Sequence, residues 1–475
     1  MKFLSRLFNF LFRRNYDGAR NDRLGGNWRP VGRQSAEEVD SPHRTVLLAR
    51  ARDLERNSDI AESAILGILR NSVGSSGIIP QAHVLRPNGE ENEELNDRIE
   101  ALWTEWAKKE NCDASGQSTF SEIQSMVLRR RIVDGEIFIR KIITKDRKFP
   151  LKLQLLESDQ LDIYKVGENI YDGIEVDEYL KPIAYWFFKE SISSGIGQAS
   201  IRVPASDVIH IFNKKRPSQI HGISELAIVM QRIKDTKEFI DAELVAARIA
   251  ACFAIFIRRN NPGGNVGRFT VDKDNKPIQS IEPGMVSYLG VGEDVIDAKP
   301  DHPKTTAGEF ISLQQRLAGA GLGQSYELLS RDLSKVSYSS VRQGNLEDRK
   351  TFKIFQQYMA DHLCRQVWGA FVEASVLSGA LKIPDFSANK QRYTLARWVT
   401  PGWEWVDPLK EVRAASESIE MGAGTLEEVC GQKGRDWQEV LKQRAREIEY
   451  AKALGLNLLT SHSCYGDEEP EPAEQ

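Results

Sequence analysis

Histidines and clustered acids are the residues of this 475-residue chain whose types could do chemistry. His210 and His221 lie in or near the end of an expected strand, where an imidazole could act as a base or bind a metal. Residues 175–178 hold three acids in four positions, a pattern that could bind a divalent cation. Neither set comes with the nucleophile, base or ligand spacing that catalysis requires. We therefore predict structural histidines, a solvated acidic loop, and no catalytic, cofactor-binding or metal-binding residues.

Motifs for nucleotide chemistry are also missing from the sequence. It contains no G-x-x-x-x-G-K-[ST] loop for phosphates. The run Gly319-Ala-Gly-Leu-Gly323 follows an expected helix, whereas a dinucleotide-binding loop follows a strand. The five cysteines are scattered without a C-x-x-C pair, which indicates reduced thiols and no zinc site. The sequence therefore predicts a protein that is not an enzyme and uses no cofactor.

The charge balance argues against a protein that grips DNA over a large surface. Lys and Arg number 64 against 68 Asp and Glu, a net charge of −4, whereas neutralising many phosphates requires a basic excess. The N-terminal segment 1–16 is basic and amphipathic, so it could lie on a membrane surface, on a partner or on its own chain. The apolar segment 244–257 is shorter than the ~20 residues of a membrane span, so we expect no stable membrane insertion.

The hydrophobic pattern of the first half predicts an α+β fold, with helices that precede a sheet. Residues 1–45 should form an N-terminal arm. Its part from 13 to 45, rich in Arg, Gly and Asn with Pro30 and Pro42, should be extended. Helical spacing follows from about residue 45 to 69 and again over 90–110. The period then changes to two, and strands are expected at 136–143, 151–156, 183–188 and 208–212.

Two helices around a small β module are expected next. The segment 224–259 lacks Gly and Pro and predicts a long helix. Small residues recur on it at intervals of four, which suits close packing against another helix; they are Ala242, Ala246, Ala250 and Ala254. Short strands and turns are predicted over 260–303, and a second helix over 304–320. Gly319, Gly321 and Gly323 should end this helix and give the segment that follows conformational freedom.

The last third of the chain is predicted to be mainly helical. An irregular loop over 321–337 should lead into a long helix over 338–378, which has an apolar seam at helical spacing. Residues 379–460 should form a helical C-terminal region with helices at 409–421 and 437–454. The acidic tail, residues 461–475, lacks the apolar residues that a packed structure requires.

From about Tyr16 to Leu456 the sequence resembles the phage portal proteins of the lambda type. Each matching segment is short, but the segments occur in the same order over some 430 residues, counted between those ends. The segments are Tyr16-Asp-Gly-Ala19 with Arg23 and Trp28, Arg50 to Asn57, Asn71 to Gly77, Asp134-Gly-Glu136, Leu155 to Asp159, Gly222-Ile-Ser224, Tyr326-Glu-Leu-Leu, Asp332-Leu-Ser334, Tyr338 to Arg342, and Asp407-Pro408 with Lys410-Glu411.

The resemblance implies a portal fold that assembles as a ring of about twelve subunits at the capsid vertex. It places residues 46–223 in an α/β wing, 224–259 and 304–320 in a two-helix stem, and 260–303 in a β-containing clip. It also implies a tunnel loop at 321–337, a long wing-to-crown helix at 338–378, and a crown region at 379–460. Arg331 and Lys335 are the cations of that loop, and we predict that they touch DNA phosphates one at a time.

The partners that the resemblance implies are double-stranded DNA, the terminase large subunit, a head-completion or adaptor protein, and the major capsid and scaffold proteins. The implied location is the portal vertex of the virion, with the host cytoplasm during assembly. Two alternatives stay open from the residues. One is a membrane-associated ring or scaffold protein of a defective prophage or gene-transfer particle. The other is a nuclease with acidic metal ligands in the sheet.

Overall fold

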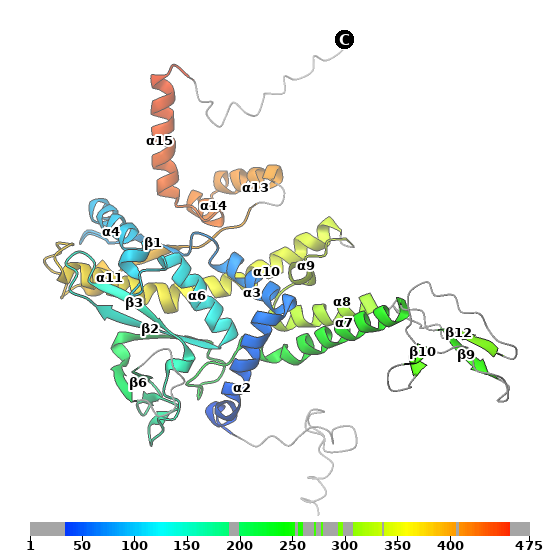
Figure 1. Cartoon of the computed structure of the whole chain (residues 1–475). Helices are drawn as coiled ribbons and strands as arrows, with labels where there is room; N and C mark the ends of the chain where they lie inside the picture. The colour runs from blue at the N-terminus through cyan, green and yellow to red at the C-terminus, as the bar shows by residue number, and fades with distance from the viewer. Residues whose placement is uncertain are drawn as a thin grey trace, which may run out of the picture.

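The computed structural model describes residues 34–189, 199–251, 255–259, 270–271, 277–278, 293–297, 307–334, 337–404 and 408–456. A body of helices and sheets carries two projections (Figure 1). One is a pair of long antiparallel helices, α7 and α8, with short strands beyond its tip. The other holds the C-terminal helices α13, α14 and α15. This arrangement agrees with the predicted α+β class.

The N-terminal part of the body is a helix that begins earlier than predicted. Helix α2 spans Ala36–Asn57, so the described residues 36–45 are helical and their assignment to an extended arm was wrong. The helix begins there because Ser35 and Glu38 form a reciprocal capping box. Pro42 lies inside the helix and removes one backbone donor. Helix α3, Asp59–Ser72, follows directly and is capped by Ser58.

The central sheet has the strand order β3-β2-β8, and all its pairs are antiparallel. Strands β2 (Glu136–Ile143), β3 (Leu151–Leu156) and β8 (Val208–Phe212) coincide with their predicted ranges. A second antiparallel sheet has the order β4-β5-β6-β7. Its strands are Ile170–Tyr171, Ile174–Val176, Pro182–Phe188 and Ser200–Pro204, and short 3₁₀ turns occur at Ser158–Gln160 (η2) and Ala205–Asp207 (η3).

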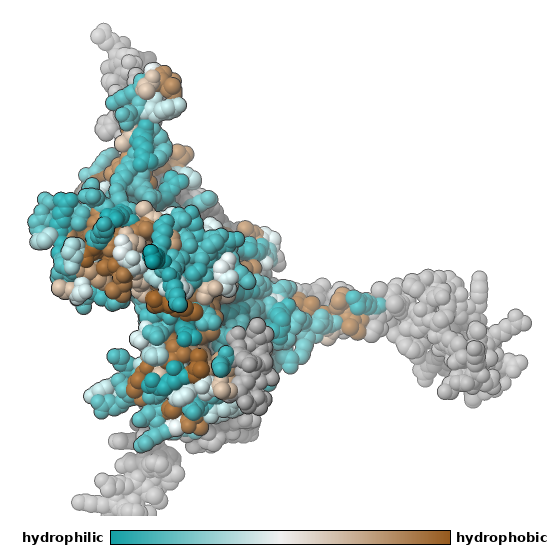
Figure 2. Space-filling model, turned by 60° about the vertical axis from the view of Figure 1, so that its left-hand side comes forward, coloured by the Kyte–Doolittle hydropathy of each residue, from teal (hydrophilic) through white to brown (hydrophobic). Residues whose placement is uncertain are grey.

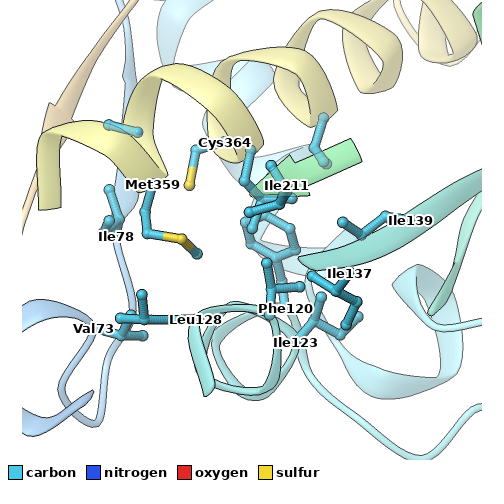
Figure 3. Close-up of a cluster of buried hydrophobic side chains, with 14 of the residues drawn as sticks. Val73, Ile78, Phe120, Ile123, Leu128, Ile137, Ile139, Ile211, Met359 and Cys364 are labelled. Carbon is cyan, nitrogen blue, oxygen red and sulfur yellow. The ribbon is translucent and has the colours of Figure 1, made fainter. Parts of the chain in front are cut away.

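The core lies between the central sheet and the helices that cover it. Helix α6, Phe120–Val133, was not predicted, yet its buried side chains meet β2 and the long helix α10–α11 (Figure 3). Helices α4, Glu93–Trp106, and α5, Lys109–Cys112, complete this layer. The ring of Trp103 lies 4.8–5.2 Å from those of Trp106, Phe120, Trp368 and Phe371, so five aromatic side chains join helices distant in sequence.

The predicted helix over 338–378 is present and contains one wider turn. Helix α10 (Tyr338–Met359) continues through a π turn, η5 (Ala360–Cys364), into α11 (Arg365–Leu377). The whole predicted seam is buried; it comprises Phe352, Phe355, Met359, Leu363, Val367 and Phe371. Burying a large apolar side chain contributes about 1.5–3 kcal/mol, so this seam holds the long helix firmly on the body.

The first stem helix is shorter than predicted, because part of its range is a strand. After the 3₁₀ turn η4, Glu225–Ile228, helix α7 spans Met230–Ala251. Ile255–Arg259 forms strand β9, which pairs antiparallel with β12, Glu293–Asp297. Alternating β-branched Ile255 and Ile257 suit a strand, and pairing with β12 outweighs the helical preference of their neighbours. The module also holds β10, Thr270–Val271, and β11, Pro277–Ile278. Apart from these strands and β12, the predicted range 260–303 lies outside the described residues.

The helix α8 and the C-terminal region differ from prediction in three places. Helix α8, Ala307–Leu322, continues through Gly319 and Gly321, and α9, Tyr326–Ser330, lies in the range expected to be irregular. Strand β13, Ala396–Val399, pairs with β1, Ile79–Ala82, within a region expected to be helical. The remaining helices are α12 (Lys390–Tyr393), α13 (Pro408–Glu420), α14 (Leu426–Gln432) and α15 (Trp437–Ala453), of which α13 and α15 were predicted. Among the described helices, none has the length and apolarity of a membrane span.

Candidate channel-lining segment and its anchors

The paired helices α7 and α8 contact each other through a specific face. The ring of Phe239 on α7 lies 4.7 Å from that of Phe310 on α8. Arg232 donates a hydrogen bond of 2.7 Å from Nη1 to Oε1 of Gln314. These contacts identify the face through which each of the two helices packs against the other within one chain.

Other faces of the same helices carry exposed apolar side chains. Ile240 and Leu244 on α7 are 39% and 49% exposed, and Leu313 and Leu317 on α8 are 48% and 44% exposed. Figure 2 shows hydrophobic surface along the described part of this projection. We name the first pair the α7 stripe and the second the α8 stripe. A projection of two helices leaves these stripes in water unless another chain covers them.

The predicted alanine ridge is only partly covered within the chain. Ala242 is exposed and Ala246 is half-buried, while Ala250 belongs to α7 and Ala254 lies outside the described residues. The ridge therefore has room for a second helix beside it, and its packing role stays a prediction.

Gly319 and Gly321, two of the three glycines predicted to act as a hinge, lie inside helix α8, where other groups pack too closely for a larger residue. A Cβ on Gly319 would lie 2.6 Å from the carbonyl oxygen of Gln324, and one on Gly321 would lie 2.7 Å from Val229. Both distances are shorter than real Cβ contacts, so only glycine lets α8 approach these groups. Gly323 ends the helix with φ +68°, a conformation that glycine adopts without strain. The predicted break of the helix at 319 is therefore wrong, and a hinge function of the three glycines remains untested.

The segment after α8 is fixed to the body by buried polar side chains. Buried Gln324 donates from Nε2 to the carbonyl of Ala64 at 2.8 Å. Asp348 on α10 accepts bonds from the backbone N–H and the hydroxyl of Ser325, at 2.8 and 2.6 Å. Burial raises the pKa of Asp348, and these two bonds oppose the rise. The start of the predicted tunnel loop is thus an anchored turn.

Arg331, a predicted DNA contact, lies at the C-terminal end of helix α9. It ends α9 in the left-handed conformation, with φ 57°, and its backbone N–H bonds the carbonyl of Glu327 at 2.9 Å. Its side chain is exposed, and no carboxylate within the described part of the chain forms an ion pair with it. Lys335, the second predicted DNA contact, lies outside the described residues.

Buried Glu136 anchors the chain just before the stem, which the sequence did not reveal. Its carboxylate accepts the N–H of Gly222 at 2.8 Å and contacts His210 Nε2 at 2.9 Å and His221 Nδ1 at 3.0 Å. Gly222 is required there, since a Cβ would lie 2.1 Å from the carbonyl oxygen of Gly135. Burial opposes ionisation of Glu136, but the charge of His221 and the two histidine hydrogen bonds hold its pKa well below the usual range.

The two histidines take different roles in this anchor. His221 Nε2 faces the carbonyl oxygen of Tyr171 at 3.1 Å while Nδ1 faces Glu136, so both ring nitrogens must donate and the doubly protonated ring satisfies both contacts. Burial lowers the pKa of His210, although Glu136 partly opposes this, and its Nδ1 has no partner among the described residues. Both rings are buried within the fold, as the predicted structural role requires.

A neighbouring group of potential metal ligands is occupied by an arginine. Glu37, Asp172 and His221 offer ligand atoms within 4.8 Å of one another. Arg44 forms ion pairs with both acids, at 2.6 Å to Asp172, and so places its positive charge between them. These contacts tie α2 to the turn between β4 and β5. The acidic run 175–178, also considered from sequence, includes Glu175, which pairs with Arg202 at 2.8 Å.

Comparison with known proteins identifies the family. Residues 21–356 match the family described as phage portal protein, lambda family. The chain is 30% identical over 460 residues to the probable portal protein of Halomonas phage phiHAP-1, covering 93% of this chain and 88% of the relative. It is 24% identical over 472 residues to portal protein B of Escherichia phage lambda, covering 90% and 88%. A chain from the neck of an empty GTA particle gives a TM-score of 0.45 at 13% identity, with 86% and 94% covered.

The family match covers more than half of the chain, and the chain spans most of each phage relative. The chain therefore belongs to the lambda family of phage portal proteins.

Proposed function

We propose that this protein is the subunit of the portal ring of a phage capsid, through which double-stranded DNA is packaged and later ejected. About twelve copies close around a channel, with a mass of roughly 640 kDa for twelve chains of 53.6 kDa. The ring performs no covalent chemistry. The terminase large subunit supplies ATP hydrolysis. It docks on the segment 260–303, and the head-completion protein docks there later. Capsid and scaffold proteins meet the wing.

The position of the two exposed stripes supports a ring. Ile240 follows the α8-facing residue Phe239 by one position, whereas Leu313 precedes the α7-facing residue Gln314 by one position. A step of one residue turns a helix by 100°. Because α7 and α8 run antiparallel, a step forward on one and a step backward on the other point to opposite faces of the pair. Ile240 of the α7 stripe and Leu313 of the α8 stripe therefore lie on opposite faces of the pair.

Opposite apolar faces favour one type of assembly. A dimer with twofold symmetry uses the same patch on both subunits, so one stripe would stay exposed. When the α7 stripe of each copy meets the α8 stripe of the next, every copy uses both faces, and a suitable rotation closes a ring. The exposed apolar residues on opposite faces of the helix pair are the observation that carries the proposal.

The test damages one face at a time. Leu244→Asp and Leu313→Asp should each prevent ring closure, because a carboxylate in an apolar contact is costly. An equimolar mixture should form a heterodimer through the remaining intact α8 stripe of one variant and α7 stripe of the other, measured by light scattering after gel filtration. Ile143→Asp, at an exposed isoleucine of β2, is the matched control. Rings from either single variant, or a mixture that stays monomeric, would contradict the head-to-tail pairing.

A further inference from the structure

A groove of about 750 Å³ opens between helix α10 and the chain that joins β13 to α15. Three tryptophans and six cations line it together with four acids, so the cations are in excess. The tryptophans Trp398, Trp403 and Trp437 and the cations Arg342, Lys353 and Arg435 form part of this lining. We name these six residues the cationic groove. Tryptophan and arginine contribute strongly to protein interfaces, because they combine apolar area with hydrogen-bond donors.

The three cations of the groove are not neutralised by the rest of the chain. Other cations along its wall are paired, Lys350 with Glu347 at 2.8 Å and Arg397 with Glu427 at 2.9 Å. Arg342, Lys353 and Arg435 are exposed, and no ion pair or hydrogen bond joins their side chains to any described residue. The groove therefore offers positive charge beside aromatic rings to an anionic ligand.

The chain itself contains a segment of the complementary charge within reach. Residues 457–475 include no Lys or Arg, and five acids fall between Asp467 and Glu474. Helix α15 begins at the groove with Trp437 and, with 17 residues at 1.5 Å each, is about 25 Å long. The eleven residues from 456 to 467 can span up to about 36 Å. The acidic segment can therefore return to the groove of its own chain, or reach that of a neighbouring copy.

We propose that the acidic segment 467–474 binds in the cationic groove. Its carboxylates meet Arg342, Lys353 and Arg435, and its prolines contact the tryptophan rings. Tethering raises the effective concentration of the segment near the groove into the millimolar range, so weak individual contacts are sufficient. The bound segment fastens the projecting helix α15 to α10, which belongs to the body.

Limited proteolysis of the full-length protein with a glutamate-specific protease tests this proposal. The tail of the wild type should be cut at least about fivefold more slowly than that of Arg342→Glu/Lys353→Glu/Arg435→Glu, as followed by mass spectrometry of the released peptide. Arg50→Glu/Lys382→Glu, which reverses two exposed cations elsewhere, is the matched control and should protect the tail as the wild type does. Equal cleavage of wild type and groove variant would overturn the proposal.

A charge swap distinguishes docking from a change in folding. When the five tail acids are replaced by lysine in the groove variant, the opposite charges should meet again and slow trypsin cleavage of the tail. The same lysine tail on the wild-type groove should be cut rapidly. No difference between these two proteins would overturn the proposal. A single-stranded 20-mer DNA that quenches the groove tryptophans equally whether or not the acidic tail is present would identify a nucleic-acid site instead, and would also overturn it. Ring mass is measured separately, so failure here leaves the proposed portal function unaffected.

Discussion

Glu136 is the single side chain that joins most separate segments of the body. It connects the start of β2, strand β8 and the turn at Gly222 that leads into the stem. We expect Glu136→Gln to lower the free energy of unfolding by about 3 kcal/mol, because the positive ring of His221 loses its buried counter-charge. Chemical denaturation measures the loss. Glu175→Gln is the control: its partner Arg202 is exposed, so less than about 1 kcal/mol should be lost. Equal losses would contradict the anchor role.

Acid should weaken the same anchor through two groups that act in one direction. The pKa of Glu136 is held low in the folded protein, so its contribution is present above about pH 4.5 and is lost as the pH falls. The pKa of buried His210 is also lowered, so below about pH 6.5 the unfolded chain takes up a proton that the folded chain resists. We therefore expect the stability that this anchor contributes to fall below about pH 6.5 through His210 and, below about pH 4.5, through Glu136 as well. His210→Gln keeps a donor for Glu136 without titrating, and should flatten the part of the curve of Tm against pH between pH 7 and pH 5; an unchanged slope would exclude His210.

At the scale of elements, the contact between α4 and α15 should weaken as the pH rises, because it involves the carboxyl group of Glu100. Burial, together with the charges of Asp436, Asp97 and Glu439, raises the pKa of Glu100 to about 7. Above pH 7 its ionised form repels these acids, so the contact should weaken as the pH rises. Because Glu100 is partly exposed, we expect Glu100→Gln to stabilise the protein at pH 8 by at most about 1 kcal/mol.

A comparison of Glu100→Gln at pH 5.5 and pH 8 controls for effects of the substitution that do not depend on ionisation. At pH 5.5 Glu100 is largely protonated, so Glu100→Gln should leave Tm nearly unchanged there while raising it at pH 8. Differential scanning fluorimetry at both pH values measures this. A gain that is equal at the two values would indicate a packing effect of the amide rather than relief of repulsion.

The sequence located element interiors well and element ends poorly, for physical reasons. Strands β2, β3 and β8 were predicted to the residue because short runs rich in β-branched and aromatic residues are a local signal. The end of α7 was missed because Ile255–Arg259 becomes a strand only by pairing with β12, more than thirty residues away. Helix α6 was missed since most of its length is buried on several sides and shows little amphipathic period. The contacts around Glu136 could not be predicted from the sequence either, because α2, β2, β8 and the loop at Gly222 meet only in the folded chain.

At the scale of the whole molecule, one buried layer links the body to the helix pair α7 and α8. Arg131 on α6 lies 3.9 Å from the ring centre of Tyr358 on the long helix and 3.2 Å from Glu225 at the base of the stem. The same long helix carries the anchor of Ser325, which holds the start of the segment with Arg331. A movement at the start of the helix pair would therefore be transmitted through Arg131 to α6 and α10. The order of most helices and strands was predictable because each depends on local sequence, whereas these contacts between them were not.

In a ring, one weak contact is repeated by symmetry, so Arg331 should matter more in the assembly than in the single chain. About twelve exposed guanidinium groups at one level of the channel would meet the phosphates of passing DNA. We expect Arg331→Glu to leave the Tm of the subunit and ring assembly unchanged, because its side chain forms no ion pair with any described residue. Heads built with this variant should lose packaged DNA at least about tenfold faster at low salt, with the difference shrinking as salt screens the charges. Arg331→Lys keeps the charge and should retain DNA almost normally. If Arg331→Glu heads pack and hold DNA like the wild type at every salt concentration, Arg331 does not contact DNA, and the channel surface must be sought elsewhere in the segment.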